Sequence, residues 1–520
     1  MDSDLTSSTG DALAPDETSL VQVGQRVIVR GKHRATVRYI GAVDGQEGFW
    51  VGLEWDDPSR GKHDGSHDGK SYFVSIVPGA ATFVRYDSLV KHGLSTGISL
   101  DEAVRIKYKD VVPAANQVVR GDVERINEFL SEDGALEVAG LASLRVSSVR
   151  DRLPFLQNVV ELDLSDNLLS GRAWGDILEL ATSLPSLRVL NLSNNRIGDA
   201  PTGDMGIGYQ NISVTTLALN GCMITKEDTV RWIGAAFPNL TELYLFDNRI
   251  RIDGTVPASF PMLQVLDLGQ NGLASWADLD RLLGELPRLR VLSLEGNAVD
   301  EVRVSASDRF PVLEHLSVAR NGMTDWDRGI QQMGLLPRLK QLRFTDNPLC
   351  SEEPDVDRLV AIGRIGSLIW INGSDVTAGE RRDCELAFVR NLDRYVTGGG
   401  SHSLPGSLEA RVASLERLYA ISRNASRATT VACTSMEQSL VVMELIRGGT
   451  QVGTRRVPSS LPLDRLKRVV DKLLVRSNDH EGQVEIVLGG FRYEAEALFG
   501  DGRPQGTVGD LRVDMLWRAM

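Results

Sequence analysis

The sequence contains few cysteines, no long apolar run and no excess of positive charge. Its four cysteines, Cys222, Cys350, Cys384 and Cys433, lack the spacing of a metal site or a disulfide framework, which indicates a reducing compartment. No stretch of about 18 consecutive apolar residues occurs and the start is acidic and polar, so neither a membrane span nor a signal peptide is predicted. A net charge of −13 argues against general nucleic-acid binding. These absences predict a cytoplasmic protein.

The 520 residues have the composition of a soluble globular protein, with 42% hydrophobic and 24% charged residues. This length predicts about three domains. The boundaries that we expect are a disordered segment at 1–19, a first domain at 20–92, a connector at 93–134, a repeat array at 135–396, a linker with a short helix at 397–435, and a last domain at 436–520. Within the connector, Val104–Tyr108 predicts a short strand and Val123–Leu130 predicts a helix.

An aromatic-rich strand and a glycine-rich loop dominate the first domain. In Phe49–Glu54 the residues alternate as in a strand, whereas Asp57–Pro58, Gly61 and Gly65 exclude a helix and predict a shaped loop. Residues 20–92 hold eight of the chain's thirty Phe, Trp and Tyr residues, and ten Lys and Arg against eight Asp and Glu. This composition predicts a groove with aromatic walls and a cationic rim, suited to a short peptide that carries an aromatic side chain and a carboxylate.

The run Gly61-Lys62-His63-Asp64-Gly65, with the aromatic strand before it and Tyr72-Phe73 after it, resembles the CAP-Gly family. Members of that family are cytoskeleton-associated modules that read acidic C-terminal tails ending in an aromatic residue. The resemblance implies a small β-barrel-like fold and a peptide-binding site made of Trp50, Trp55, Gly61, Lys62, His63, Asp64, Gly65 and Phe73. His63 replaces the usual Asn of the family, and a histidine makes the charge at this position sensitive to pH near neutrality.

The same part of the chain allows two other interpretations, a hydrophobic core and a metal site. Trp50, Trp55, Phe73 and Phe83 are equally consistent with core positions of a small β-domain, with or without a place in the groove. His63 and His67 with neighbouring aspartates lie in a glycine-rich loop without cysteine, so no metal site is predicted.

Gly69-Lys70-Ser71 is similar to the end of a phosphate-binding loop, but Asp64 stands where that motif requires glycine, so no nucleotide cofactor is predicted.

The middle of the chain is a leucine-rich-repeat array. Leu-x-Leu pairs, or degenerate versions of them, begin at Leu162, Leu190, Leu217, Leu243, Leu266, Leu292, Leu316 and Leu342, with spacings of 28, 27, 26, 23, 26, 24 and 26 residues. An asparagine follows most pairs, at Asn167, Asn195, Asn248, Asn271, Asn297, Asn321 and Asn347. The leucines are expected to fill the interior and each asparagine to bind backbone groups at a turn. Cys222 occupies the asparagine position of its coil, which favours a structural role over a reactive thiol.

The array is expected to carry irregular coils at its ends and a binding face on its strands. Ala135–Val149 predicts a first coil, and Leu368–Gly373 with Val376–Arg382 resembles a C-terminal cap. Outward strand positions predict a concave contact face that contains Tyr244, Phe246, His315 and Arg343, with His315 and Arg343 equivalent in position to Tyr244.

The last domain is similar to a ubiquitin-like fold in the order of its predicted elements. These are a strand at Leu440–Leu445, a turn and a second strand, a helix at Ser459–Leu474 and a strand at Val484–Leu488. A helix at Leu408–Ile421 is predicted before it, after the flexible Gly398–Gly406 linker. The absence of a terminal Gly-Gly argues against conjugation and favours docking.

The order of CAP-Gly module, leucine-rich repeats and ubiquitin-like α+β domain resembles the tubulin-folding cofactor E family. This resemblance implies a cytoskeleton-associated chaperone that binds α-tubulin and its C-terminal tail, works with other tubulin-folding cofactors, and contacts the proteasome or a cofactor through its last domain. No catalytic triad, metal set or nucleotide loop supports an enzyme. Two alternatives are a microtubule adaptor that docks a signalling partner on the repeats and a proteasome shuttle for tubulin.

Overall fold

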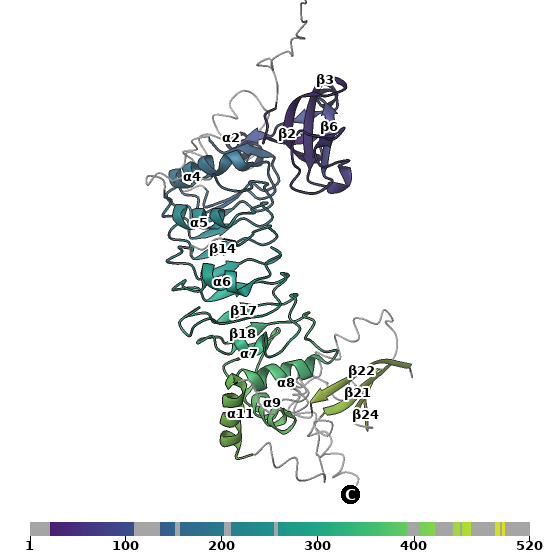
Figure 1. Cartoon of the computed structure of the whole chain (residues 1–520), viewed down its shortest axis with the longest axis vertical. Coiled ribbons are helices and arrows are strands. Elements are labelled where there is room, and N and C mark those ends of the chain that lie inside the picture. The colour runs from purple at the N-terminus through teal and green to yellow at the C-terminus, as the bar shows by residue number, and fades with distance from the viewer. Residues whose placement is uncertain are drawn as a thin grey trace, which may run out of the picture. The chain divides into compact units, whose positions relative to one another are not determined.

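The computed structural model describes residues 21–108, 136–150, 156–201, 210–253, 258–392, 406–421, 440–447, 450–458, 484–488 and 491–494 (Figure 1). The chain divides into two compact units. The first comprises Met1–Pro354 and Ile365–Asp375, and the second comprises Asp355–Arg364 and Val376–Met520. The predicted disorder at 1–19 and the predicted helices at Val123–Leu130 and Ser459–Leu474 lie outside the described residues.

A five-stranded antiparallel sheet forms the first module of unit 1. Its strands are β1 (Arg26–Val29), β2 (His33–Val43), β3 (Gln46–Trp55), β6 (Ala81–Arg85) and β7 (Leu94–Ser95), in the order β6-β3-β2-β1-β7. Between β3 and β6 lie a short 3-10 turn, η1 (Pro58–Arg60), and the hairpin of β4 (Ser66–His67) and β5 (Lys70–Ser71). Among the described strands, β6 and β7 form the two edges of this sheet, and its barrel-like closure stays a prediction.

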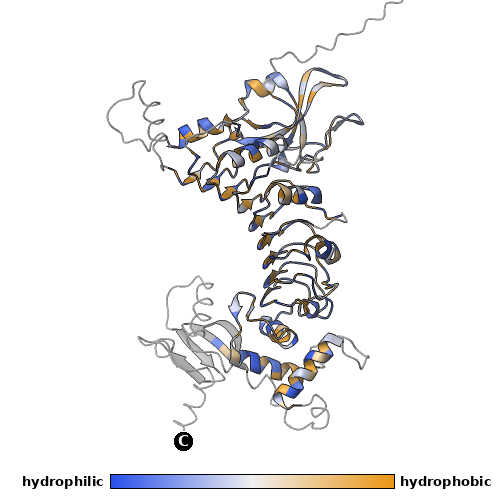
Figure 2. Cartoon of the chain, turned by 90° about the vertical axis from the view of Figure 1, so that its left-hand side faces the viewer, coloured by the Kyte–Doolittle hydropathy of each residue, from blue (hydrophilic) through white to orange (hydrophobic). Residues whose placement is uncertain are grey.

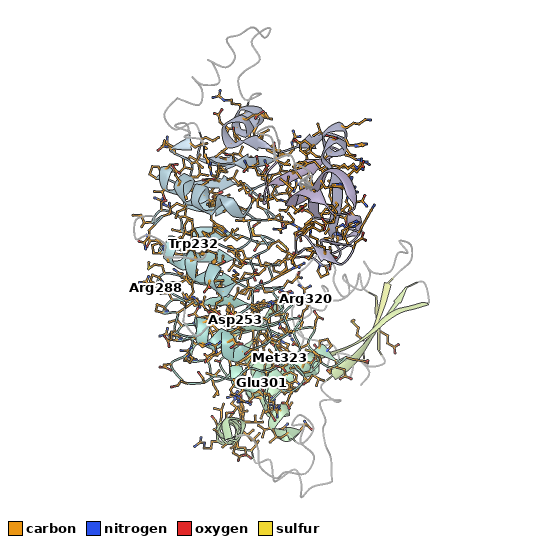
Figure 3. All side chains as sticks on the ribbon, turned by 45° about the horizontal axis from the view of Figure 1, so that its top comes forward. Trp232, Asp253, Arg288, Glu301, Arg320 and Met323 are labelled. Carbon is orange, nitrogen blue, oxygen red and sulfur yellow. The ribbon has the colours of Figure 1, made fainter. Side chains whose placement is uncertain are left out.

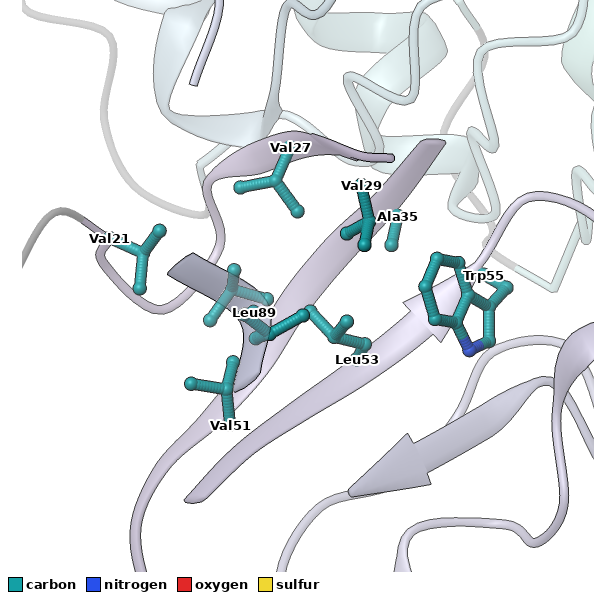
Figure 4. Close-up of a cluster of buried hydrophobic side chains, with 9 residues drawn as sticks. Val21, Val27, Val29, Ala35, Val51, Leu53, Trp55 and Leu89 are labelled. Atoms are coloured by element: carbon teal, nitrogen blue, oxygen red, sulfur yellow. The ribbon is translucent and has the colours of Figure 1, made fainter. Parts of the chain in front are cut away.

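One side of this sheet forms the core of the module (Figure 4). Valines of β1, β2 and β3 pack there with Leu53, Trp55 and Leu89, and Leu89 belongs to the helix α1 (Tyr86–Lys91). Alternate residues of a strand point to opposite faces, so burying Val51, Leu53 and Trp55 leaves the even-numbered residues of β3 for the other face. The core therefore fixes which residues of β3 are free to form a site.

The segment after α1 differs from its prediction in two ways. Strand β7 pairs with β1 through Val29 and Leu94, so the first sheet extends beyond the boundary expected at residue 92. Residues 104–108, predicted as a strand, instead belong to the helix α2 (Leu100–Tyr108). Its buried residues Leu100, Ala103 and Val104 follow helical spacing, and Asp101 lies in its first turn, where an acidic side chain favours a helix. A short parallel pair, β8 (Ile98–Ser99) with β10 (Val146–Ser148), then leads into the repeats.

An eleven-stranded sheet runs through the repeat array in the order β20-β19-β18-β17-β16-β15-β14-β13-β12-β11-β9. Its strands are β9 (Val138–Gly140), β11 (Glu161–Asp163), β12 (Val189–Asn191), β13 (Thr216–Ala218), β14 (Glu242–Tyr244), β15 (Val265–Asp267), β16 (Val291–Ser293), β17 (His315–Ser317), β18 (Gln341–Arg343), β19 (Trp370–Ile371) and β20 (Ser374–Asp375). All neighbours pair in parallel except β19 and β20. The leucine-rich repeats and the predicted first coil, which contains β9, are confirmed.

A ladder of buried asparagines connects successive coils. The side-chain N–H of Asn195 donates to the backbone oxygens of Leu164 and Leu192, and its Oδ1 accepts from the N–H of Leu169. At Cys222 the thiol donates to the backbone oxygen of Leu192 over 3.3 Å, as the asparagine amide does elsewhere. Complete burial raises the pKa of the Cys222 thiol to about 12, so the predicted structural role fits its environment.

The residue before each ladder position has a left-handed backbone. The φ angles are positive at Asp166, Asn194, Gly221, Asp247, Gln270, Gly296, Arg320 and Asp346. A left-handed residue reverses the chain sharply after each strand and is costly for side chains other than glycine, asparagine and aspartate. The turn is therefore imposed by the coil, because even Gln270 and Arg320 adopt it.

Helices return the chain between several of the strands. These are α4 (Trp174–Ser183), which follows the 3-10 turn η4 (Gly171–Ala173), then α5 (Glu227–Ala236), α6 (Trp276–Leu283) and the short α7 (Ile330–Met333). Hydrophobic residues recur from coil to coil along the array (Figure 2). They form its continuous core, since Leu190, Leu217, Leu243 and their counterparts are fully buried.

Unit 2 contains α8 (Pro354–Arg364), α9 (Ala378–Arg390) and α11 (Gly406–Tyr419), and α11 confirms the helix predicted after the linker. Helix α9 begins with a capping box of Thr377 and Glu380. Glu385 of α9 accepts hydrogen bonds from Arg411 and Tyr419 of α11 and thereby joins the two helices. The predicted cap is thus divided: β19 and β20 extend the repeat sheet of unit 1, whereas α9 belongs to unit 2.

The end of the chain contributes a four-stranded antiparallel sheet in the order β22-β21-β23-β24. Its strands are β21 (Leu440–Arg447), β22 (Thr450–Pro458), β23 (Val484–Leu488) and β24 (Phe491–Glu494). Two of the strands confirm those predicted at Leu440–Leu445 and Val484–Leu488. The assignment to a ubiquitin-like fold stays a prediction.

Candidate peptide-binding site

On the face of β3 that points away from the core, Gly52 leaves space that the ring of Phe73 fills. A Cβ atom added at Gly52 would lie 2.4 Å from Cε1 of Phe73 and 2.9 Å from Cβ of Tyr39. The absence of a side chain therefore lets Phe73 pack directly on the strand backbone. Tyr39 of β2 and Phe83 of β6 pair with Gly52 in register, so both neighbours project on the same face.

Four rings gather around that of Phe83 on this face, and we call Tyr39, His63, Tyr72, Phe73 and Phe83 the aromatic cluster. The ring centroids of His63, Tyr72, Phe73 and Tyr39 lie 4.9, 5.4, 5.6 and 6.0 Å from that of Phe83. All five residues are only half-buried. An exposed cluster of this kind offers an apolar surface of defined geometry for an aromatic side chain.

The loop at residues 61–65 depends on its two glycines. A Cβ atom at Gly61 would lie 1.9 Å from the backbone oxygen of Gly79, and one at Gly65 would lie 2.1 Å from that of Phe73. Gly65 also has a φ of +107°, which other residues rarely adopt. Only glycine therefore lets the loop lie against its neighbours in this conformation.

Lys62 and Asp64 are the exposed charges of this loop. The backbone N–H of Lys62 donates to the oxygen of Ala81 over 2.7 Å, which fixes the residue while its side chain extends into solvent. The carboxylate of Asp64 instead accepts from the backbone N–H of Ser66 over 3.1 Å, and hydrogen bonds from Ser66 lower the pKa of Asp64. Lys62 is thus the cation that the loop presents, and Asp64 stabilises the turn.

Both ring nitrogens of His63 face backbone donors. Nδ1 lies 3.0 Å from the N–H of Gly65, and Nε2 lies 3.2 Å from the N–H of Phe83. A neutral imidazole accepts at one nitrogen only, and an imidazolium accepts at neither. Burial lowers the pKa of His63, although the nearby Asp64 acts in the opposite direction. The site therefore favours the neutral ring.

A second cation borders the aromatic cluster. Nζ of Lys70 lies 5.1 Å from the ring centroid of Tyr72 and 2.8 Å from a carboxylate oxygen of Asp44. The hydroxyl of Tyr72 accepts from the backbone N–H of Asp44 over 2.7 Å. The predicted site did not include Lys70, Tyr39 or Tyr72, although Tyr72 adjoins Phe73 in the run that carries the family resemblance. The sequence leaves Phe83 open between the core and the groove.

Of the two tryptophans of the predicted site, only Trp55 lies on the opposite face of β3 from the cluster, because Trp50 shares the even-numbered face with Gly52. Trp55 is buried in the core on the opposite face of β3, where its ring contacts the guanidinium of Arg60 at 5.0 Å. Trp50 pairs with Arg85 in register, and the Arg85 guanidinium lies 5.4 Å from its ring. The structure therefore brings together Gly61, Lys62, His63, Asp64, Gly65 and Phe73, and does not bring Trp55 to them.

The residues predicted for the repeat face fall into two groups, Tyr244 with Phe246 on the coil of β14, and His315 with Arg343 on β17 and β18. Tyr244 and Phe246 lie on the coil of β14, and the Tyr244 hydroxyl donates to Glu242 over 2.8 Å. Burial and the Glu242 carboxylate raise the pKa of Tyr244 to about 12. Arg343 of β18 is equivalent to Tyr244 in register, as predicted.

His315 is not equivalent to Tyr244, which corrects the prediction. The strand pairing aligns His315 with Glu242, two residues earlier in the coil. Burial lowers the pKa of His315. Both groups lie on outward strand positions, but β15 and β16 separate them.

Comparison with known proteins agrees with the two modules of unit 1. Residues 23–89 match the CAP-Gly domain family, and residues 183–200 match a leucine-rich-repeat family. The chain is 32% identical to the tubulin-specific chaperone E of Danio rerio, over 73% of this chain and 74% of that protein. This chain belongs to the tubulin-specific chaperone E family.

Other members of the family have comparable sequence identity to this chain. The tubulin-specific chaperone E of Homo sapiens is 30% identical, over 74% of this chain and 75% of its own length. The tubulin-folding cofactor E of Arabidopsis thaliana is 29% identical, over 86% of this chain and 88% of its own length. The aromatic cluster and the Lys62 loop thus belong to the CAP-Gly domain of a tubulin-specific chaperone E family member.

Among the described residues, no group of three or more His, Cys, Asp or Glu side chains is arranged to hold a metal ion. Within the same part of the chain, no helix has both the length and the apolar character needed to cross a bilayer.

Proposed function

We propose that this protein is a tubulin-folding chaperone that holds α-tubulin at two places. The CAP-Gly domain takes the acidic C-terminal tail, which ends in an aromatic residue, and the repeats contact the folded body. With other folding cofactors it acts in assembly or dissociation of the αβ heterodimer. The proposal is supported by membership of a family whose proteins are named tubulin-specific chaperones and by the chemistry of the CAP-Gly face.

The observation that carries the proposal is the aromatic cluster beside Lys62. A terminal aromatic side chain can pack edge-to-face on the half-buried rings of Tyr39, Phe73 and Phe83, which already adopt that arrangement with one another. A carboxylate next to this ring can meet the exposed ammonium group of Lys62. The aromatic cluster therefore favours a peptide with a terminal aromatic ring, and Lys62 favours a peptide with a negative charge beside that ring.

Two weak contacts on one chain give stronger capture than either alone. Once the tail is bound, the tubulin body is held at a high effective concentration near the repeats. Tyr244 and Phe246, adjacent on outward positions of the β14 coil, are the aromatic residues that we assign to this second contact.

The test is a titration of the full-length protein with an acidic peptide that ends in Tyr and with the same peptide lacking that Tyr. The Tyr-ended peptide should bind more tightly. Reversing the charge with Lys62→Glu should lower its affinity by about tenfold, since the lysine is exposed and its loss removes a solvent-screened attraction. Equal affinity for the two peptides contradicts the proposed role of the aromatic cluster.

Lys91→Glu provides the matched control. Lys91 is an exposed lysine of the same domain, located at the end of α1. A general effect of net charge would weaken binding equally in both variants. A specific contact at the loop weakens it in Lys62→Glu alone.

A further inference from the structure

The strands β16, β17 and β18 place charged residues in a regular row. They pair in parallel, with Val291, His315 and Gln341 side by side. The residues just before them, Arg290, Glu314 and Lys340, therefore occupy equivalent positions on three consecutive coils. Backbone hydrogen bonds hold this alignment, because the oxygen of Arg290 accepts from the N–H of Glu314 and the oxygen of Glu314 accepts from that of Lys340.

In this row one carboxylate is shared by two cations. Glu314 lies 3.1 Å from Arg290 and 3.3 Å from Lys340. Its side chain is 15% exposed, whereas those of Arg290 and Lys340 are 55% and 49% exposed. Hydrogen bonds from Lys340 and Arg290 lower the pKa of Glu314, so it stays ionised. The carboxylate is covered while much of each cation faces outward.

A second shared carboxylate lies on the same three coils. Glu295 is 2.7 Å from Arg320 and 3.6 Å from Arg343. Both arginine side chains are 51% exposed, and Glu295 is 19% exposed. A guanidinium has five N–H donors, so pairing with one carboxylate oxygen leaves donors for another acid. Figure 3 shows Arg320 on the side of the array away from Arg288.

We call Arg290, Arg320, Lys340 and Arg343 with Glu295 and Glu314 the β16–β18 surface. Its four cations outnumber its carboxylates, even when the exposed Asp346 at its margin is included. The outward strand residues between them include no Asp, Glu, Lys or Arg, and burial lowers the pKa of His315, with Glu314 acting against this shift and Arg290 and Lys340 acting with it.

The preceding coils differ, because Glu242 and Asp267 stand on the outward positions of β14 and β15. The sign of the charge therefore changes along the array.

We propose that the β16–β18 surface binds an acidic segment of a partner protein. The backbones of residues two strands apart, such as Arg290 and Lys340, are separated by about 10 Å, because neighbouring strands lie about 4.8 Å apart. A segment in the polyproline II conformation advances about 3.1 Å per residue with about three residues per turn, so acidic side chains three residues apart share one face at about that separation. Such a segment supplies further carboxylates to the four cations, which share only Glu295 and Glu314 within the protein. This surface is defined by its own residues and does not depend on the proposed role of the CAP-Gly domain.

The test uses the full-length protein and a fluorescein-labelled oligoglutamate peptide of about ten residues, amidated at its C-terminus and without aromatic residues. Binding, followed by fluorescence anisotropy, should weaken as salt increases. The double variant Arg320→Glu with Arg343→Glu should lower the affinity by about tenfold or more, since two attractive contacts become repulsive. Absence of binding to the unmodified protein overturns the proposal.

Arg288→Glu is the control, because Arg288 is an exposed arginine of the same array and lies away from Arg320 (Figure 3). An equal loss in this variant shows general attraction to the chain and also overturns the proposal. If the double variant has a lower melting temperature, the milder pair Arg320→Gln and Arg343→Gln gives the same comparison without like charges beside Glu295.

The double variant should still prefer the peptide that ends in Tyr. Loss of that preference concerns the CAP-Gly domain, so the two proposals fail separately.

Discussion

The rings of His63 and Phe83 stack with centroids 4.9 Å apart, while the backbone N–H of Phe83 points at Nε2 of that same histidine. One residue thus supplies an apolar contact and a polar one to His63. A protonated ring keeps the first and loses the second, because it has no free acceptor. Because the neutral ring accepts at only one of its two nitrogens, protonation removes the single acceptor available to the N–H groups of Phe83 and Gly65. Charging His63 therefore opposes the conformation of the loop that presents Lys62.

Tail-peptide binding should weaken as the pH falls from about 8 to about 5, and His63→Asn should remove most of that change. Burial lowers the pKa of His63 from its ordinary value of 6.5. The stability from the neutral ring is therefore complete above 6.5 and is lost as the pH falls toward the lowered pKa. Peptide affinity measured across this range in the two proteins checks the prediction.

His92→Asn is the control for this pH effect, since His92 is exposed on the same domain. It should show the pH profile of the unmodified protein. If His63→Asn also keeps that profile, the pH dependence arises elsewhere.

Gly52→Ala should disrupt the peptide-binding face. The added Cβ atom meets Phe73 at 2.4 Å, and displacing a packed ring costs about 1–3 kcal/mol. Both the tail-peptide affinity and the melting temperature of the CAP-Gly domain should fall. Gly175→Ala in α4 is the matched control, because nothing lies within 4 Å of its added Cβ atom. Unchanged peptide binding in Gly52→Ala would show that Phe73 is not held by this contact.

Asp56→Asn should destabilise the CAP-Gly domain by about 3 kcal/mol, because it leaves a buried guanidinium without its counter-charge. Arg26 is 1% exposed and donates to both carboxylate oxygens of Asp56, over 2.6 and 2.5 Å. Burial opposes ionisation of Asp56, yet the Arg26 hydrogen bonds hold its pKa below the ordinary value.

This stabilisation is present at neutral pH and is lost as the pH falls through the lowered pKa of Asp56. Thermal unfolding of Asp56→Asn is compared with that of Glu47→Gln, which removes the same charge from an exposed position. Equal melting temperatures in these two variants would contradict the prediction.

Replacing Tyr244 and Phe246 together by Ala should weaken binding of whole tubulin by about 2 kcal/mol or more, a usual loss for central aromatic contacts. Binding of the isolated tail peptide should not change, because these residues lie on the repeats. The measurement is titration with purified tubulin dimer and with tail peptide. If the double variant binds the dimer as tightly as the unmodified protein does, the contact with the tubulin body lies on another part of the array.

The repeats were predictable because each coil has the same requirements. A leucine must fill the interior and an amide must bond the backbone groups at the turn. Both residue types therefore recur in the sequence at a nearly constant spacing. The connector offered no such repetition. Val104–Tyr108 alternates apolar and polar residues as a strand does, and the helix becomes visible only when Leu100 and Ala103 are included.

The peptide-binding face was only partly predictable. The alternation along β3 already separates Trp55, which shares the face of Val51 and Leu53, from Gly52. Tyr39 could not be placed, because its strand has an irregularity between Val37 and Tyr39. Without that bulge the two residues would share one face, whereas in the structure Val37 is in the core and Tyr39 joins the aromatic cluster. Strand register, which single sequences do not reveal, decides this part of the site.

Under mechanical load, a stack of coils opens where the connection between neighbours is weakest. Asn195 connects the coils of β11 and β12 through two amide N–H donors and one oxygen acceptor. Cys222, at the equivalent position of the next coil, has only one thiol donor, which forms weaker hydrogen bonds. Among the described positions of the asparagine ladder, the side chain of Cys222 therefore makes the weakest connection between two coils. The coils of β12 and β13 nevertheless have a second connection under load, because the carboxylate of Asp199 in the first coil accepts hydrogen bonds from Thr225, Lys226 and Thr229 of the next.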